Sequence, residues 1–400
     1  MASIKVKFRP SSVNGKKGVI YYQIIQNRVI RQLRTDYHVA IDDWDEENFI
    51  VKTDNSEQQK ELVEIQENIN WDVKRLEYVV SLLEKKEKEF SADDIINFYE
   101  EHLNELSLFS FMREQIKRLQ KEDKQRTAET YTTTLYSIGR FLNHKDILMD
   151  EITSDLIKKY EESLHEQGVT KNSSSFYMRI VRAAYNRAVS IGVIEQHYPF
   201  KEVYTGIDQT VRHALPLSFI KRMKDMDYSN NQPLEFARDM FMFSFYTRGM
   251  AFVDMSFLKK TDLTDGSLVY RRRKNGQKLF VRWEPCMQEI VDKYAAAPEN
   301  PYLLNILTPP FKNERNQYKN VLYQLNKSLK EVGTDLGLNF PLTMYVARHS
   351  WASIAHSKDV DVSVISEGLG NDSEQATQIY LASLDNTLVD KANSSILEDL

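Results

Sequence analysis

The sequence predicts a mainly α-helical, multidomain protein that also contains small β-sheets. Its 400 residues exceed what one ordinary hydrophobic core can organise. The first fifty residues alternate apolar and polar side chains with the period of a strand, whereas residues 56–200 repeat apolar side chains with the period of a helix. We therefore expect an N-terminal sheet with a long helix over residues 1–105, a helical domain over 106–205 and a mixed α/β domain over 214–400.

Three segments near the N-terminus have the alternation expected of strands. Apolar side chains at positions 4, 6 and 8 alternate with Lys5, Lys7 and Arg9, and similar segments follow at residues 19–26 and 29–34. Lys5, Lys7 and Arg9 are candidate DNA-binding residues on a basic face of this sheet. The alternative is an ordinary solvated sheet face, which is the usual place for such side chains.

Helical periodicity begins at Ser56 and continues to a charge-rich end at residues 84–89. Ser91 is expected to cap a short helix, because Asp94 stands in the capping-box position. Four further helices are predicted at residues 109–121, 127–142, 153–167 and 173–191. This pattern indicates an all-helical middle domain.

Basic side chains gather on two of these four helices. Arg113, Lys117 and Lys121 lie on one face of the first, at i, i+4 spacing, and the fourth carries Arg179 and Arg182. We take all five as candidate DNA-binding residues, because a basic stripe on a helix can follow a row of phosphates. The same stripe can also be plain solvated surface, and periodicity does not separate the two.

Composition and charge narrow the class of protein. The formal net charge of −5 argues against a nucleic-acid partner. The objection weakens when charge is considered locally, because residues 271–282 contain six basic side chains and no acid. The single cysteine, Cys286, excludes an internal disulfide framework and a cysteine-based zinc site, and it fits a reducing, cytoplasmic setting. No apolar segment is long enough to cross a membrane.

The last third of the chain lacks the common cofactor motifs. It contains no phosphate-binding P-loop, no dinucleotide glycine fingerprint and no paired-histidine metal helix, so we expect no cofactor and no metal. Asn275-Gly276 instead marks the turn of a β-hairpin, and this turn presents Lys274 at the tip.

Three short motifs follow one another near the C-terminus. They are Thr-Met-Tyr-Val-Ala-Arg-His-Ser-Trp at residues 343–351, Gly-Asn-Asp at residues 370–372 and Thr-Gln-Ile-Tyr at residues 377–380. Together with Lys274, their order and separations resemble the catalytic domain of the tyrosine recombinases of the phage-integrase family. That family has a His-x-x-Arg-His motif, then a Leu-Gly-His turn, then a tyrosine nucleophile.

The resemblance implies a three-part integrase of a bacterial mobile element. Its parts are an arm-type DNA-binding domain, a helical core-binding domain and a mixed α/β catalytic domain, at the boundaries given above. It implies site-specific recombination through a 3′-phosphotyrosine on Tyr380, with Arg348 at the phosphate oxygens, Lys274 as general acid and His349 as a proton-handling neighbour. The implied partners are double-stranded recombination sites, further copies of the chain in a tetramer and accessory DNA-bending proteins, in the bacterial cytoplasm at the nucleoid.

The chain departs from the family pattern at three positions. Tyr345 stands where the family has its first histidine, and Asn371 stands where it has the second. Both can hydrogen-bond a phosphate oxygen, but neither carries the charge of a protonated histidine. The family's first arginine falls on Ala251, so we expect Arg248 to supply that guanidinium. The alternative is that Arg248 pairs with Asp254 or another acid.

Two other functions remain open from the sequence. A type IB topoisomerase-like enzyme would share the tyrosine chemistry, although two DNA-binding modules before the catalytic domain favour recombination. A DNA-binding protein with an inactive site is suggested by the departures at positions 251, 345 and 371. A short helix is expected at 386–392 and an apolar end at 396–400, and the family resemblance implies that such a tail passes to a neighbouring protomer. The alternative is a tail that packs on its own domain or is disordered.

Overall fold

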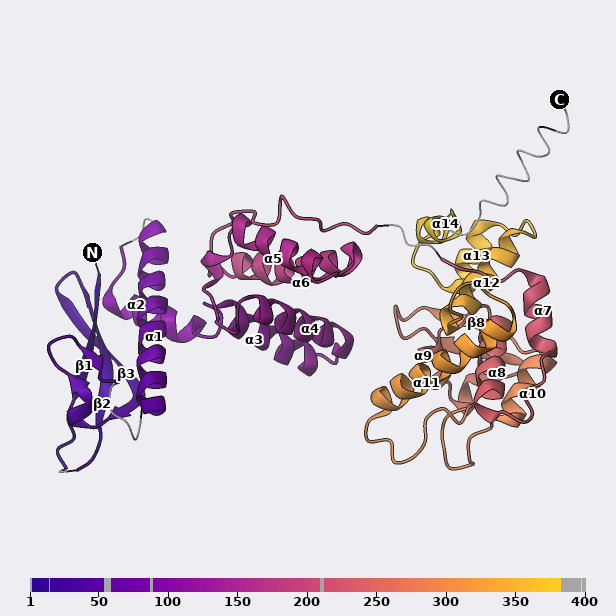
Figure 1. The fold of residues 1–400 in the computed structure, drawn as a ribbon, viewed down its shortest axis with the longest axis horizontal. Helices are drawn as coiled ribbons and strands as arrows, with labels where there is room; N and C mark the ends of the chain where they lie inside the picture. Colours follow the sequence, from indigo (N-terminus) through magenta and orange to yellow (C-terminus); the bar gives the residue numbers. More distant parts are fainter. Residues whose placement is uncertain are drawn as a thin grey trace. The chain divides into compact units, whose positions relative to one another are not determined.

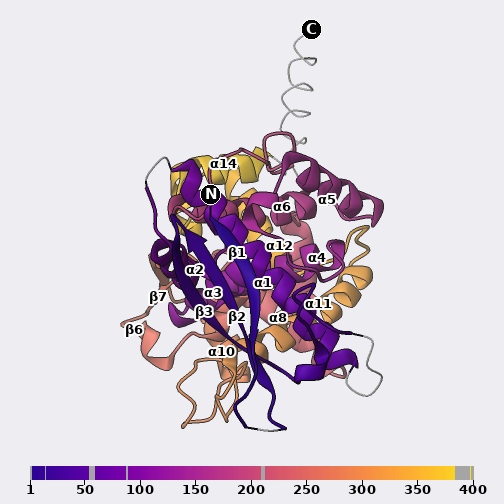
Figure 2. The ribbon, with the colours of Figure 1, turned by 90° about the vertical axis from the view of Figure 1, so that its left-hand side faces the viewer.

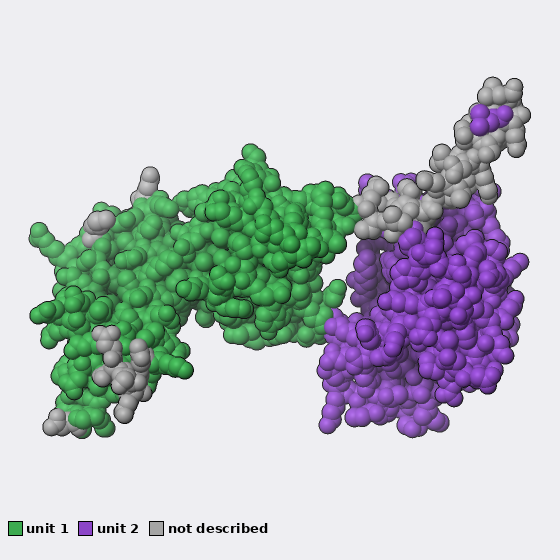
Figure 3. Space-filling view, viewed as in Figure 1, with its two compact units in different colours: residues 1–208 green, residues 209–400 purple. Residues whose placement is uncertain are grey.

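Helices predominate in the fold, and the strands are confined to small sheets (Figure 1). The computed structural model describes residues 2–13, 15–53, 59–86, 89–208, 212–382 and 397. The chain divides into two compact units, residues 1–208 and residues 209–400 (Figure 3). The prediction of a mainly α-helical, multidomain fold with small sheets is confirmed.

The N-terminal sheet has three antiparallel strands in the order β1-β2-β3. They are β1 (Ser3–Arg9), β2 (Gly18–Gln26) and β3 (Val29–Val39). The third strand is longer than predicted, because its pairing with β2 continues to the Gly18–Val39 pair across a register shift. Side chains alternate along β2, so that Ile20, Tyr22 and Ile24 are buried on one face. Helices α1 (Gln59–Lys85) and α2 (Ala92–His102) cover this sheet (Figures 1 and 2).

One buried carboxylate joins this sheet to both helices. Asp72 of α1 accepts hydrogen bonds from Tyr22 of β2 at 2.8 Å and from Tyr37 of β3 at 2.9 Å. It also accepts from Tyr99 of α2 at 3.2 Å and from Arg75. A buried charge with this many donors is well satisfied, so the network fixes how the sheet and the two helices pack.

Local capping explains where α2 begins. Ser91 accepts a hydrogen bond from the backbone N–H of Asp94, and the Asp94 carboxylate accepts from the backbone N–H of Ser91 at 2.8 Å. This is the predicted capping box. The predicted start of α1 at Ser56 lies outside the described residues, and the described helix begins at Gln59.

The rest of the first unit is helical apart from a short strand pair. The pair is β4 (Trp44–Asp45) with β5 (Ile50–Val51), after a 3₁₀ turn at Ile41–Asp43. The four predicted helices are present within a few residues of their expected ends. They are α3 (Leu108–Lys121), α4 (Gln125–Phe141), α5 (Ser154–Glu166) and α6 (Lys171–Ser190), with a 3₁₀ turn at Met149–Glu151 before α5.

The second unit is built around α8 (Gln232–Tyr246). Four consecutive residues, Met240 to Phe243, are all buried, because neighbouring helices contact α8 on several sides. These neighbours are α7 (Leu217–Asp225), α10 (Pro285–Lys293), α11 (Glu314–Asp335) and α12 (Met344–His356).

The remaining elements of this unit supply the candidate site. They are α9 (Phe252–Ser256), a 3₁₀ turn at Lys260–Asp262, the sheet β6 (Leu263–Thr264), β7 (Ser267–Arg271) and β8 (Lys278–Arg282), and the helices α13 (Val362–Leu369) and α14 (Glu374–Ala382). The predicted hairpin is therefore present as β7 and β8. The helix predicted at residues 386–392 lies outside the described residues.

Candidate active site

Arg348 lies at the centre of the candidate site, on the second turn of α12, with only 4% of its surface exposed. Its Nη1 donates to the carbonyl oxygen of Gly249 at 3.0 Å. Its Nη2 donates to the carbonyl oxygen of Leu369 at 2.7 Å and to Oδ1 of Asn371 at 3.0 Å. These acceptors belong to the turn after α8 and the turn after α13, so one guanidinium holds together segments that are far apart in the sequence.

Gly249 allows the turn after α8 to approach α12 closely. Its φ of +73° lies in the left-handed region, and a Cβ at this position would lie 2.6 Å from Cα of Arg348. A larger residue would therefore displace the backbone that carries Arg348. The requirement for glycine here comes from both the backbone conformation and the lack of space.

We expect Gly249→Ala to reduce the free energy of unfolding more than the same change at Gly337. Both glycines follow a helix with positive φ, but a Cβ at Gly337 would meet nothing within 4 Å. Gly337→Ala should cost about 1 kcal/mol for the left-handed backbone. Gly249→Ala should cost roughly 2 kcal/mol more because of overpacking. Urea unfolding measures both values, and equal losses would contradict the close approach.

Asn371 connects Arg348 to the helix that carries Tyr380. Its Oδ1 accepts from Arg348, and its Nδ2 donates to Oγ1 of Thr377 at 2.8 Å. Thr377 is fully buried on α14, and Tyr380 follows three residues later on the same helix. The side chain of Tyr380 lies outside the described part of the structure. The position of α14 therefore depends on the same asparagine that contacts Arg348.

The tip of the β7–β8 hairpin docks on the turn after α13. Nδ2 of Asn275 donates to the carbonyl oxygen of Gly370 at 3.2 Å and to Oδ1 of Asp372 at 2.5 Å. Lys274 is the adjacent residue in this turn, and its side chain is exposed. The structure thus brings the hairpin carrying Lys274 to the same turn that Arg348 contacts.

Asp254 is buried on α9 and accepts a hydrogen bond from the backbone N–H of Arg273 at 2.8 Å. Burial raises the pKa of this carboxyl above its usual range, while the hydrogen bond and nearby arginine charges act in the opposite direction. Arg248 is half-buried in the turn before α9, with a φ of +62°. Among the described side chains, no carboxylate lies within ion-pair distance of Arg248, so the alternative pairing with Asp254 is absent there.

His349 is buried beside Arg348, and its ring contacts that of Tyr345 with centroids 4.7 Å apart. Burial lowers the pKa of His349 to about 4, and the charges of Arg212 and Arg348 add to this effect. His349 is therefore neutral at pH 7. Tyr345 is exposed on α12.

The predicted DNA-binding residues have unequal surroundings. On α3, Arg113, Lys117 and Lys121 are all exposed, although Lys117 forms an ion pair with Glu114 at 2.7 Å. On α6, Arg179 and Arg182 are half-buried and donate to Ser175 O at 3.4 Å and Thr205 Oγ1 at 2.9 Å, respectively.

The predicted basic positions of β1 are partly engaged within the first unit. Lys7 lies 4.3 Å from the ring centroid of Phe49, and Arg9 donates to Gln32 at 2.9 Å. Lys5 is exposed. Lys7 and Arg9 therefore each have one contact within the first unit.

One arginine at the site has no role in the predictions from sequence. Arg272, the residue directly after β7, is buried with 7% of its surface exposed, and its Nη1 donates to the carbonyl oxygen of Gly370. The alternation along β7 is the signal that could have identified it. Leu268, Tyr270 and Arg272 all lie on the buried face of the hairpin.

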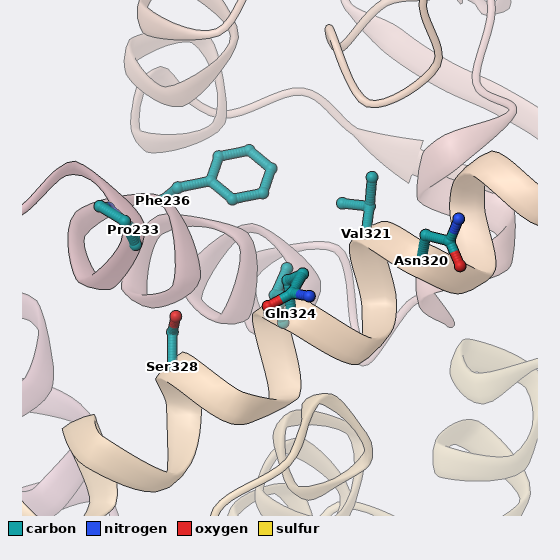
Figure 4. A pocket seen from close by; sticks show the side chains of 7 residues that line it. Pro233, Phe236, Asn320, Val321, Gln324 and Ser328 are labelled. Carbon is teal, nitrogen blue, oxygen red and sulfur yellow. The ribbon is translucent and has the colours of Figure 1, made fainter.

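A mainly apolar pocket of about 350 Å³ lies between α8 and α11, apart from this site (Figure 4). Its lining includes Phe236 and Val321, and it lies near the start of α8, whereas Arg348 contacts the turn beyond the end of α8. In the described ranges, we find no group of three or more His, Cys, Asp or Glu side chains placed to hold a metal ion. None of the described helices is both long and apolar enough to cross a membrane.

Comparison with known proteins identifies the middle domain and the fold. Residues 107–203 match the phage integrase SAM-like domain family. A lambda integrase tetramer bound to a Holliday junction has a TM-score of 0.54 and 17% identity, over 90% of this chain and 92% of that chain. A lambda integrase fragment, as a dimer bound to a core site, has a TM-score of 0.53 and 17% identity, over 69% and 95%.

A transposon protein has the same fold. The Tn1549 integrase in complex with a circular intermediate DNA has a TM-score of 0.52 and 14% identity, over 74% of this chain and 100% of that chain. No curated protein sequence matches the chain. The chain therefore contains a phage integrase SAM-like domain and has the multidomain fold of lambda integrase, which agrees with the resemblance seen in the sequence.

Proposed function

We propose that this chain is a site-specific DNA recombinase that cleaves and rejoins DNA through a 3′-phosphotyrosine on Tyr380. The observation that carries the proposal is the hydrogen-bonded connection from Arg348 through Asn371 to Thr377. It links a buried guanidinium, suited to a phosphate, to the helix that carries the tyrosine. The fold shared with lambda integrase and the Tn1549 integrase supports the same conclusion.

The proposed cleavage needs no metal and no nucleotide. The phenolic oxygen of Tyr380 attacks the phosphorus and displaces the 5′-oxygen, while Lys274 gives that oxygen a proton. Arg348 stabilises the charge on the nonbridging oxygens. His349 is neutral at pH 7 and can accept the proton that Tyr380 releases. Because the phosphotyrosine retains the bond energy, the reverse attack by a 5′-hydroxyl rejoins the DNA.

The proposed partners are duplex recombination sites and further copies of the chain. The exposed basic face of α3, formed by Arg113, Lys117 and Lys121, is proposed to follow the DNA backbone, with β1 as a second DNA contact. The DNA-bound dimer and tetramer of lambda integrase support assembly on DNA. Accessory DNA-bending proteins remain a further proposal.

Trapping a covalent adduct on a nicked suicide substrate tests this function. Cleavage near the nick releases a short 5′-hydroxyl strand, so the phosphotyrosine cannot be reversed and accumulates. We expect a labelled protein–DNA adduct that survives denaturation. A complete lack of adduct, with DNA binding intact, would favour the inactive DNA-binding protein. Efficient plasmid relaxation without strand exchange between sites would favour the topoisomerase-like alternative.

We expect deletion of residues 394–400 to impair assembly more than binding. This segment includes the apolar end, which we propose passes to a neighbouring protomer. The truncated chain should bind a single site with unchanged affinity but lose cooperative binding to paired sites. Gel-shift titrations on single and paired sites measure both quantities. Equal loss on both substrates, or no loss on either, would contradict the assembly role.

A further inference from the structure

The proposed reaction leaves one position without a cation. Charge develops on two nonbridging oxygens of the phosphate, and Arg348 is one donor group. Ala251, at the start of α9, falls where the resemblance places another arginine, and it has no donor side chain. A second guanidinium should therefore come from another element near the turn after α13.

Arg272 has the burial and the unsatisfied donors expected of such a group. A guanidinium has five N–H donors, and among the described residues only Gly370 O accepts a hydrogen bond from the guanidinium of Arg272. Its Nε is buried with no acceptor. No described carboxylate lies within 4.0 Å of the Arg272 guanidinium. The buried Asp254 of α9 accepts its hydrogen bond from the backbone N–H of Arg273 instead. Burying a charged group with so few partners is costly, and an anion in the site would offset that cost.

The surroundings of Arg272 place it beside Arg348. Arg348 donates to Leu369 O and to Asn371 Oδ1, and Arg272 donates to Gly370 O between them. The two guanidinium groups thus contact three consecutive residues of one turn. Both charges also act on the buried Asp254 carboxylate.

The hairpin is also attached to the helix that begins after Ala251. Asp254 of α9 accepts from the backbone N–H of Arg273 at 2.8 Å, so the residue next to Arg272 is fixed to that helix. The guanidinium of Arg272 is therefore carried by a segment that is hydrogen-bonded to α9, the helix that directly follows Ala251, which has no donor side chain.

We propose that Arg272 is a phosphate-binding catalytic residue, which supplies the second guanidinium to the nonbridging oxygens in the place where Ala251 has none. This inference rests on the proposed recombinase function. Arg248 is the competing candidate from the sequence. It is half-buried, and its side chain passes Gly368, where a Cβ would lie 3.7 Å from Cδ of Arg248. Because Arg248 is more accessible than Arg272, water can accept hydrogen bonds from its guanidinium. Its burial therefore gives no reason to expect a bound anion.

The test measures single-turnover cleavage of the suicide substrate at saturating DNA. Arg272→Ala should slow adduct formation by about a hundredfold or more, as expected for loss of one well-placed donor. Arg222→Ala is the matched control. Arg222 of α7 also donates to one backbone carbonyl, that of Leu336 at 3.3 Å, and its loss should leave the rate unchanged. A wild-type cleavage rate in Arg272→Ala would overturn the proposal.

A neutral substrate separates phosphate contact from a structural role. A methylphosphonate at the scissile position replaces one nonbridging oxygen with a methyl group, which removes the charge that Arg272 would stabilise. Arg272→Ala should lose less than about tenfold on this substrate, relative to the wild type on the same substrate. An equal loss on both substrates would show that Arg272 only supports the turn at Gly370. If the methylphosphonate reduces the cleavage loss of Arg248→Ala but not that of Arg272→Ala, the phosphate contact belongs to Arg248.

Two further measurements keep the outcome interpretable. Arg272→Lys retains the positive charge in a similar volume. The ratio of its cleavage rates on the phosphodiester and the methylphosphonate therefore tests the phosphate contact even if Arg272→Ala does not fold. Thermal unfolding of each variant shows whether it is folded. A wild-type protein that forms no adduct on the phosphodiester would reject the proposed function itself. A wild type that cleaves, with Arg272 variants equally active, would reject only this inference.

Discussion

Tyr380→Phe is expected to abolish the covalent adduct while DNA affinity stays unchanged. Phenylalanine retains the ring on α14 but has no oxygen to attack the phosphorus. The adduct is measured on a denaturing gel with labelled suicide substrate, and affinity is measured by gel shift. A loss of more than about a thousandfold is expected, because no other group can replace a nucleophile that forms the intermediate.

The matched control for this experiment is Tyr323→Phe. Tyr323 is an exposed tyrosine on α11 in the same unit, so its hydroxyl should not affect cleavage. Adduct formation that persists in Tyr380→Phe would assign the nucleophile to another tyrosine. Tyr345 would be the first to test, because it is exposed on α12 one helical turn before Arg348.

Arg348→Lys is expected to slow cleavage by roughly a hundredfold to a thousandfold, although it conserves the charge. Lysine cannot present two parallel donors to a phosphate, and it cannot reach Gly249 O, Leu369 O and Asn371 Oδ1 together. The buried carbonyl oxygens then lose their donor, which should reduce the free energy of unfolding by about 2 kcal/mol. Single-turnover cleavage and urea unfolding measure the two effects.

Arg222→Lys is the control for this second prediction. Arg222 makes one hydrogen bond to a backbone carbonyl. Arg222→Lys should therefore change the cleavage rate and the free energy of unfolding less than Arg348→Lys does. A cleavage rate near that of the wild type in Arg348→Lys would mean that charge alone is required at the phosphate. It would contradict the bidentate role.

Elements with a strong local period were predictable from the sequence. The four helices of the middle domain follow from apolar spacing, and the start of α2 follows from Ser91 and Asp94. The full length of β3 was not predicted, although residues 35–39 also alternate, because a register shift interrupts the pairing with β2 there. Pairing between strands is a non-local interaction that one segment cannot reveal.

The candidate site was predictable in its ordered motifs but not in its contacts. Arg348, Asn371 and Lys274 were proposed from the resemblance of their motifs to the tyrosine recombinases. The role of Gly249 depends on how closely the turn after α8 approaches α12, and no local pattern in the sequence indicates this. The contacts of Asn371 with Arg348 and Thr377 were not predictable either, because they join segments that only the fold brings together. Arg272 was hidden for a different reason, since a run of basic residues suggests a solvated surface and only strand alternation places it inside.

The asparagine at position 371 affects how the site responds to acidity. A histidine ring can accept a hydrogen bond from an arginine only while it is neutral, so protonation near its usual pKa would break the contact with Arg348. An asparagine amide does not titrate in this range, and its acceptor and donor keep their roles. His349 is likewise uncharged well above its pKa of about 4. From mildly acidic to mildly alkaline conditions, the link from α12 to α14 therefore stays in one protonation state.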